Sequence, residues 1–144
     1  MLLTITLFAY QEIFLYNYLL ILFSIPYINM EYGSPFKKPP IHTDPFPGSW
    51  TPLHDKSPFI LVGAESILDH ITTNFNYKLP PQLKLELFTA GAQIVSGINI
   101  YLELNVDKLY VQALIYDPAP TKGLHEHKLK IKDIYVTEKD IFSK

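Results

Sequence analysis

The sequence contains no cysteine and no arginine. Without cysteine, the chain has no disulfide scaffold, no thiolate nucleophile and no zinc or iron–sulfur site held by Cys ligands. All 12 basic residues are lysine, and with 14 acidic residues they give a formal net charge of −2. Because a chain with neither arginine nor a basic surplus lacks the usual means of neutralising phosphates and reading bases, we expect no nucleic-acid partner.

Motifs for catalysis and cofactor binding are also missing. The six glycines are scattered along the chain and form no phosphate-binding loop. The best metal candidate is His125-Glu126-His127, but a third ligand has no evident position, and a short polar turn explains the trio as well. The carboxylate pairs, Glu65 with Asp69 and Asp133 with Glu138, are typical of solvated faces. We therefore predict no enzyme activity, no metal and no cofactor.

The first 29 residues form a hydrophobic leader with 21 apolar or tyrosine side chains and one charge, Glu12. Its densest run, residues 13–23, is shorter than the roughly 20 residues of a spanning helix and closer to a signal-peptide core. No basic residue precedes the run, and the residues after Ser24 make a poor cleavage site. Three interpretations stay open: a secretory signal, an uncleaved anchor, or a non-native leader before Met30. The first predicts a secreted protein, the third a cytoplasmic one, and membrane contact would come only through the leader.

Residues 30–56 form a proline-rich arm. Seven of the 12 prolines lie between residues 31 and 58, where they remove amide donors and favour extended backbone. Such a segment is neither a helix nor a central strand. It is predicted to be an extended arm before the domain at 57–144.

The domain at 57–144 begins with one helix. Ser57 supplies a capping hydroxyl and Pro58 suits the first helical position. Apolar side chains then follow helical spacing for about five turns, until Pro80 and Pro81 prevent any continuation. They are Ile60, Ala64, Ile67, Leu68, Ile71 and Phe75.

After these prolines the apolar period changes from 3.6 to 2. Four alternating segments follow, near residues 83–87, 98–105, 109–116 and 128–132. Their connections, near 90–97, 105–108 and 117–125, are short enough for hairpins, which predicts an antiparallel meander. One amphipathic helix laid across such a sheet gives an α+β fold with a single core.

The connection at 90–97 is unusual for a hairpin tip. Tips are normally polar, yet this one contains Ile94 and Val95 between Gln93 and Gly97. Exposed apolar residues at a tip suggest insertion into a partner's cleft. On spacing alone, the same two residues also fit the continuation of a strand.

Three segments resemble the cystatins, protein inhibitors of papain-like cysteine proteases, over about residues 46–135. Residues 93–97, Gln-Ile-Val-Ser-Gly, resemble the family's Gln-x-Val-x-Gly loop. Residues 47–53, Pro-Gly-Ser-Trp-Thr-Pro-Leu, resemble the Gly-Gly-Trp-x-Pro trunk of plant cystatins. Residues 111–119 resemble the strand and Pro-Trp loop of the second hairpin. With no cysteine, the chain is most similar to the disulfide-free plant and stefin-like types.

The resemblance implies a cystatin-like α+β fold, with one long helix packed across a four- to five-stranded antiparallel sheet. It also implies reversible, competitive inhibition of a papain-like cysteine protease, in which a trunk and two hairpin loops form a wedge that occludes the active-site cleft. The residues implied to contact the protease are Gly48, Gln93, Ile94, Val95, Ser96, Gly97, Pro118 and Ala119.

Two departures from the family leave an alternative open. Ala119 stands where the family usually has Trp, and Ser49 replaces the second trunk glycine. The first removes the largest apolar contact of the second loop, so a non-inhibitory interaction module on the cystatin fold is the competing hypothesis. A monomer is expected, with a domain-swapped dimer hinged at 90–97 as the alternative.

Overall fold

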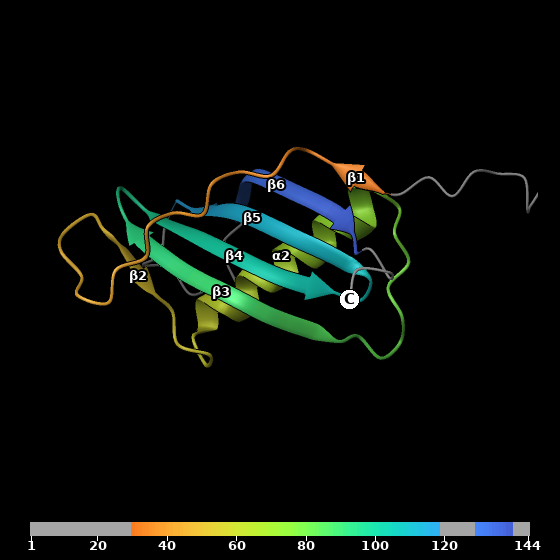
Figure 1. Ribbon diagram of the computed structural model, residues 1–144, viewed down its shortest axis with the longest axis horizontal. Helices are drawn as coiled ribbons and strands as arrows, with labels where there is room; N and C mark the ends of the chain where they lie inside the picture. The colour runs from red at the N-terminus through yellow and green to blue at the C-terminus, as the bar shows by residue number, and fades with distance from the viewer. Residues whose placement is uncertain (1–29, 119–128, 140–144) are drawn as a thin grey trace, which may run out of the picture.

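The computed structural model describes residues 30–118 and 129–139 of the chain. The leader at 1–29, Ala119 and the His125–His127 trio therefore lie outside the described residues. The described chain forms one helix and six strands, with α2 behind the sheet in Figure 1. In chain order the elements are β1 (Glu31–Tyr32), β2 (Trp50–Pro52), α2 (Pro58–Asn74), β3 (Leu85–Ile94), β4 (Ile98–Val106), β5 (Leu109–Asp117) and β6 (Lys130–Glu138).

Helix α2 begins where the sequence predicts. Ser57 occupies the N-cap with extended backbone and Pro58 follows it, but the Ser57 hydroxyl makes no capping hydrogen bond, contrary to the expectation. One face of the helix is buried, and Gly63 lies on it. A Cβ at Gly63 would stand 2.7 Å from Cδ1 of Leu102, so close helix–sheet packing explains a glycine at a position where alanine favours the helix by roughly 1 kcal/mol.

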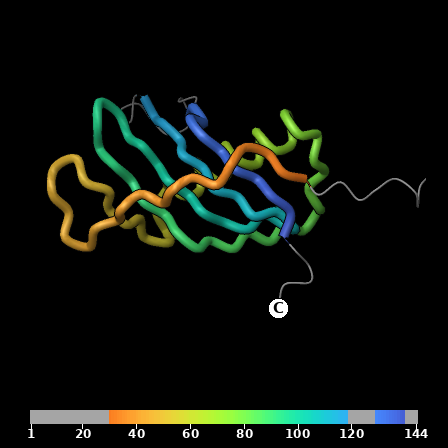
Figure 2. Tube along the Cα trace, turned by 45° about the horizontal axis from the view of Figure 1, so that its top comes forward, coloured from red at the N-terminus to blue at the C-terminus, as the bar shows by residue number. Residues whose placement is uncertain are grey.

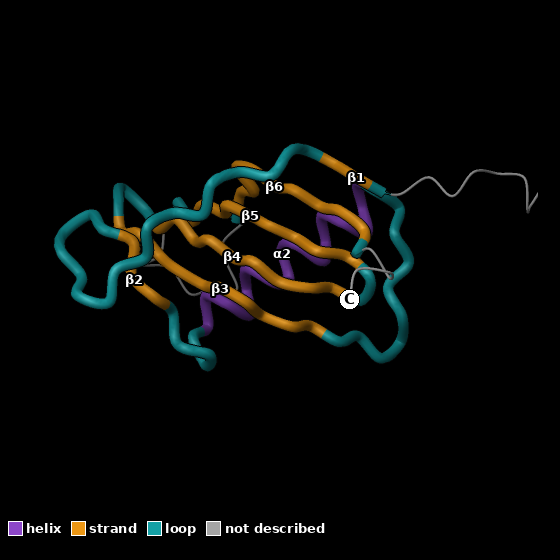
Figure 3. The backbone as a smooth tube through the Cα atoms, viewed as in Figure 1, coloured by secondary structure: helices purple, strands orange, loops and turns teal. Residues whose placement is uncertain are grey.

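The sheet is wholly antiparallel, in the order β1-β6-β5-β4-β3-β2. Strands β3 to β6 form the predicted meander, which confirms the α+β class with one helix on an antiparallel sheet (Figure 3). The prediction of four to five strands is wrong, because the arm adds β1 beside β6 as well as β2 beside β3. Both additions are edge strands, which agrees with the prediction that the arm forms no central strand, and Pro52 of β2 is at a position that an edge strand tolerates.

Strand β3 is longer than the sequence predicts and continues to Ile94. The small residues Ala90, Gly91 and Ala92 are therefore part of a strand and do not form a turn. A Cβ at Gly91 would lie 2.8 Å from Cδ1 of Ile41, so the small side chains make room for the arm.

The core lies between α2 and the sheet. Alternate residues of β4 and β5 point toward the helix and are almost fully buried. Burying each large aliphatic side chain stabilises the fold by about 1.5–3 kcal/mol. These strand residues are Ile100, Leu102, Leu104, Val106, Leu109, Val111, Ala113 and Ile115, and they pack with Ile67 and Ile71 of the helix.

The outer face of the sheet is crossed by residues 33–49, the strap that joins β1 at one edge to β2 at the other (Figure 2). Gln112 of β5 holds it: the Phe36 amide donates to Gln112 Oε1, and Gln112 Nε2 donates to the Phe36 oxygen, both at 3.3 Å. The Phe36 ring lies edge-on to Tyr101, with centroids 6.0 Å apart. Tyr101 is consequently fully buried, although the alternating pattern places it on the face away from the helix.

No helix among the described residues is long and apolar enough to cross a membrane.

Candidate functional site

Three chain segments meet at one end of the sheet. Strand β2 starts there at Trp50, the β3–β4 hairpin turns there between Ile94 and Ile98, and β5 ends there at Asp117. We call residues 46–49, 93–97 and 116–118 the loop edge, at the left of Figure 1. The edge brings together Gly48, the five residues Gln93 to Gly97, and Pro118, all of which the resemblance to the cystatins implies to be contact residues.

The first hairpin presents apolar side chains to solvent. Ile94 is the last residue of β3 and is 74% exposed, and Val95, in the turn, is 45% exposed. The Val95 amide donates to the Gly97 oxygen at 2.9 Å, which closes the tip. Ile94 thus continues the strand and is exposed as well, so the two interpretations of this segment are compatible.

The trunk glycine sits in a tight turn beside this hairpin. The Ser49 amide donates to the Phe46 oxygen at 2.9 Å, and the Phe46 amide donates to Ser49 Oγ at 3.0 Å. Gly48 has φ +79°, a backbone conformation that favours glycine, and a Cβ there would meet nothing within 4 Å. The turn therefore requires glycine, and the side of Gly48 that a Cβ would occupy is open for close approach.

A chain of hydrogen bonds fastens the trunk to the sheet. Gln93 Nε2 donates to the Gly48 oxygen at 2.9 Å, and Gln93 Oε1 accepts from Asn99 Nδ2 at 3.0 Å. Asn99 Oδ1 in turn accepts from Lys132 Nζ at 3.3 Å, and this ammonium lies 4.8 Å from the centre of the Tyr116 ring. The chain runs from β6 to the trunk, so the relative positions of trunk and first hairpin are held by side chains from three strands.

The first hairpin also packs on the end of β5. Gly97 is buried, and a Cβ there would lie 2.5 Å from the Asp117 main-chain oxygen and 2.7 Å from the Tyr116 ring. The Tyr116 hydroxyl donates to the Ser96 oxygen at 3.1 Å. Gly97 thus permits contact between the hairpin and the start of the second loop, whose first residue, Pro118, is exposed. Ala119, the next implied contact, lies outside the described residues.

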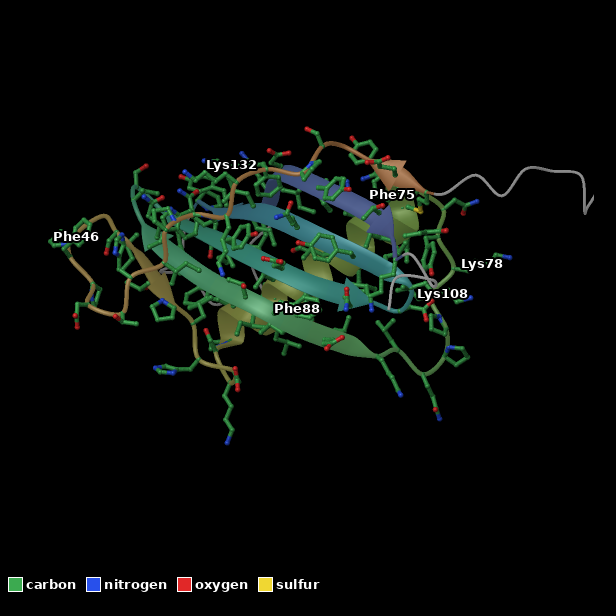
Figure 4. All side chains as sticks on the ribbon, in the orientation of Figure 1. Phe46, Phe75, Lys78, Phe88, Lys108 and Lys132 are labelled. Atoms are coloured by element: carbon green, nitrogen blue, oxygen red, sulfur yellow. The ribbon has the colours of Figure 1, made fainter. Side chains whose placement is uncertain are left out.

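The structure adds functional candidates that sequence reasoning missed. Phe46 is 58% exposed at the projecting end of the strap, beyond β2 (Figure 4). The prolines on both sides of it, Pro45 and Pro47, were the available signal, because they favour extended backbone and leave an aromatic ring between them. Asn99 and Lys132 had no signal, since only the tertiary structure brings them to Gln93.

The chemistry of the loop edge is that of a contact surface. It offers apolar side chains and exposed main chain, with the Lys132 ammonium group beside it. The described residues contain no group of three or more His, Cys, Asp or Glu side chains placed to hold a metal ion. This chain matches no family model, no curated protein and no solved structure.

Proposed function

We propose that this protein is a reversible, competitive inhibitor of papain-like cysteine proteases, built on a cystatin-like fold. The loop edge would enter the protease cleft and occlude it, with no catalysis by the inhibitor. The observation that carries the proposal is the Gln93–Gly48 hydrogen bond, because it joins the two segments whose sequences resemble the trunk and first loop of the cystatins, 45 residues apart in the chain.

The exposed tip supports the same proposal. Ile94 and Val95 stand out from the sheet at the end where the trunk turns. Fully burying a side chain such as Ile94 in a complex is worth roughly 1.5–3 kcal/mol, which corresponds to about 10- to 100-fold in affinity. A tip held by the Gln93 and Tyr116 hydrogen bonds loses little conformational entropy on binding.

Papain hydrolysis of a small peptide substrate tests the proposal, with the full-length chain as inhibitor. We expect competitive inhibition and a loss of about 10- to 100-fold in affinity for Ile94→Asp. Leu61→Asp is the matched control, because Leu61 is 64% exposed on α2 and outside the loop edge. Absence of inhibition by the wild-type chain at micromolar concentration, against papain and several related proteases, would overturn the proposal.

One observation favours the alternative, a non-inhibitory interaction module. The trunk is not a free end: Ile41 forms a bridge with Trp50, and the His42 amide donates to the Trp50 oxygen at 2.8 Å. The chain before the trunk is therefore tied beside it, and residues 42–49 project as a loop (Figure 1). If this loop blocks entry into a protease cleft, shortening residues 43–46 should create inhibition that the wild-type chain lacks.

A further inference from the structure

The outer edge of strand β3 is open along half of its length. On one side β3 pairs with β4 over its whole length, but on the other side β2 pairs with it only at Gly91 to Gln93. Within residues 30–118 and 129–139, no strand pairs with the segment from Leu85 to Phe88 on the side away from β4 (Figure 3). An edge of this kind is a template for pairing with another strand.

The main-chain groups of this segment face outward at Leu85 and Leu87. The Asp107 amide donates to the Lys84 main-chain oxygen at 3.2 Å, so the main-chain groups of Lys84 point toward β4. Because main-chain groups alternate in direction along an antiparallel strand, the N–H and C=O of Leu85 and Leu87 point to the open edge. A register shift at Phe88 ends this pattern, and beyond it the Ala90 oxygen accepts from the Leu53 amide. The segment available for pairing is therefore residues 83–87.

The sequence of this segment, Leu-Lys-Leu-Glu-Leu, is complementary to itself in antiparallel pairing. If Leu85 stands opposite the partner's Leu85, then Lys84 stands opposite the partner's Glu86, and the reverse contact follows by symmetry. Directly opposite charges on paired strands contribute roughly 0.2–1 kcal/mol per pair. We propose that the chain forms a two-fold symmetric dimer through its β3 edges, centred on Leu85.

The leucines of the segment supply the apolar part of the contact. Leu85 and Leu87 pair in register with Val106 and Leu104, which are buried against the helix, yet they remain 46% and 36% exposed. Helix α2 crosses the sheet diagonally and leaves this end of β3 uncovered (Figure 1). In the dimer, Leu87 meets the partner's Leu83, so the three leucines of each copy form one continuous strip. A two-fold contact of this kind closes on itself and leaves no edge for further growth at this site.

The dimer leaves the loop edge free. Leu85 begins β3 and Ile94 ends it, so the pairing site and the exposed tip lie at opposite ends of the strand. Because the paired strands are antiparallel, the two loop edges would point in opposite directions. The proposal is independent of protease inhibition, and it differs from a swapped dimer because no element is exchanged.

Sedimentation velocity on the full-length chain, over a series of protein concentrations, tests the dimer. A contact of five residues is smaller than a standard interface, so we expect weak, rapidly reversible association. Lys84→Glu should weaken association about tenfold, because it places like charges opposite each other twice. The double variant Lys84→Glu with Glu86→Lys should restore it, and so should an equimolar mixture of the two single variants, in which every opposing pair is again of opposite charge.

Leu85→Pro is the second arm of the test. It removes an amide that faces the open edge and takes no part in the β3–β4 ladder, so the far-UV circular dichroism and the folded state should be kept while the dimer is lost. A wild-type chain that stays monomeric up to high micromolar concentration would overturn the proposal. So would association that survives Leu85→Pro, as a swapped dimer would, or a Lys84→Glu variant that associates as the wild type does.

Discussion

Gln93 and Gly48 are joined by a 2.9 Å hydrogen bond from the glutamine side-chain amide to the glycine main-chain oxygen. The bond connects the last turn of the strap to the end of β3, and Gln93 stands opposite Trp50 in the sheet register. The Gln93 side chain therefore sets the distance between trunk and hairpin.

Replacing Gln93 by alanine should loosen the trunk without unfolding the domain. The variant loses the bonds to Gly48 and Asn99, so we expect faster amide exchange at Ser49 and inhibition of papain weakened by about 5- to 10-fold. Gln82→Ala is the matched control, because Gln82 is exposed and lies before β3. Equal effects from the two variants would contradict the positioning role.

Gly97→Ala should destabilise the protein, although alanine is a small side chain. Its Cβ would stand 2.5 Å from the Asp117 oxygen, and a main-chain atom of a paired strand has little room to move. We expect a loss on the order of 2 kcal/mol in the free energy of unfolding, measured with urea. Ser96→Ala, one residue earlier and exposed, should change it by less than about 0.5 kcal/mol.

Gln112→Ala should release the strap from the sheet. The variant leaves the Phe36 main chain without its side-chain partner, at a cost of about 1–3 kcal/mol. Limited trypsin digestion should then cut faster after Lys37, within the strap. Cleavage after Lys56, in the exposed turn before α2, provides an internal reference that should keep its rate. An unchanged rate at Lys37 would show that Gln112 does not hold the strap.

Alkaline pH should destabilise the outer face of the sheet. Burial, followed by contact with Glu103, raises the pKa of Tyr101 to about 12, and burial beside Glu103 also raises the pKa of Tyr110. The folded state thus holds these protons more tightly than the unfolded state, where tyrosine titrates near pH 10. The stabilisation is complete below pH 10 and is lost as the pH rises toward 12.

Urea unfolding between pH 9 and pH 12 measures this effect. The free energy of unfolding should fall with pH above 10. The slope should be shallower in Tyr101→Phe, because this variant lacks the Tyr101 hydroxyl, whose pKa is raised in the folded state. A wild-type slope in Tyr101→Phe would exclude Tyr101 as a source of the pH dependence.

Local patterns in the sequence were sufficient for α2 and for the antiparallel order of β3 to β6. The extent of the last strand was not predicted correctly, because β6 continues to Glu138, beyond the segment expected near 128–132. The helix start at Pro58 and the alternation along β4 and β5 follow from proline geometry and from side-chain period, which depend only on near neighbours. The Ser57 cap and the end of β3 were not predicted correctly. The end of β3 depends on what packs there: Gly91 leaves room for Ile41, which is distant in the chain. Nothing in the structure explains the missing Ser57 cap bond.

The candidate site divides in the same way. The sequence by itself indicated a hairpin tip near Gln-Ile-Val-Ser-Gly and a turn at Pro-Gly-Ser-Trp, because both runs are local features. Only the tertiary structure decided that the proline-rich arm crosses the outer face and returns the trunk to Gln93. Nothing in a local pattern specifies the Gln112–Phe36 pair, 76 residues apart, because such a contact forms only when the folded sheet brings its partners within reach.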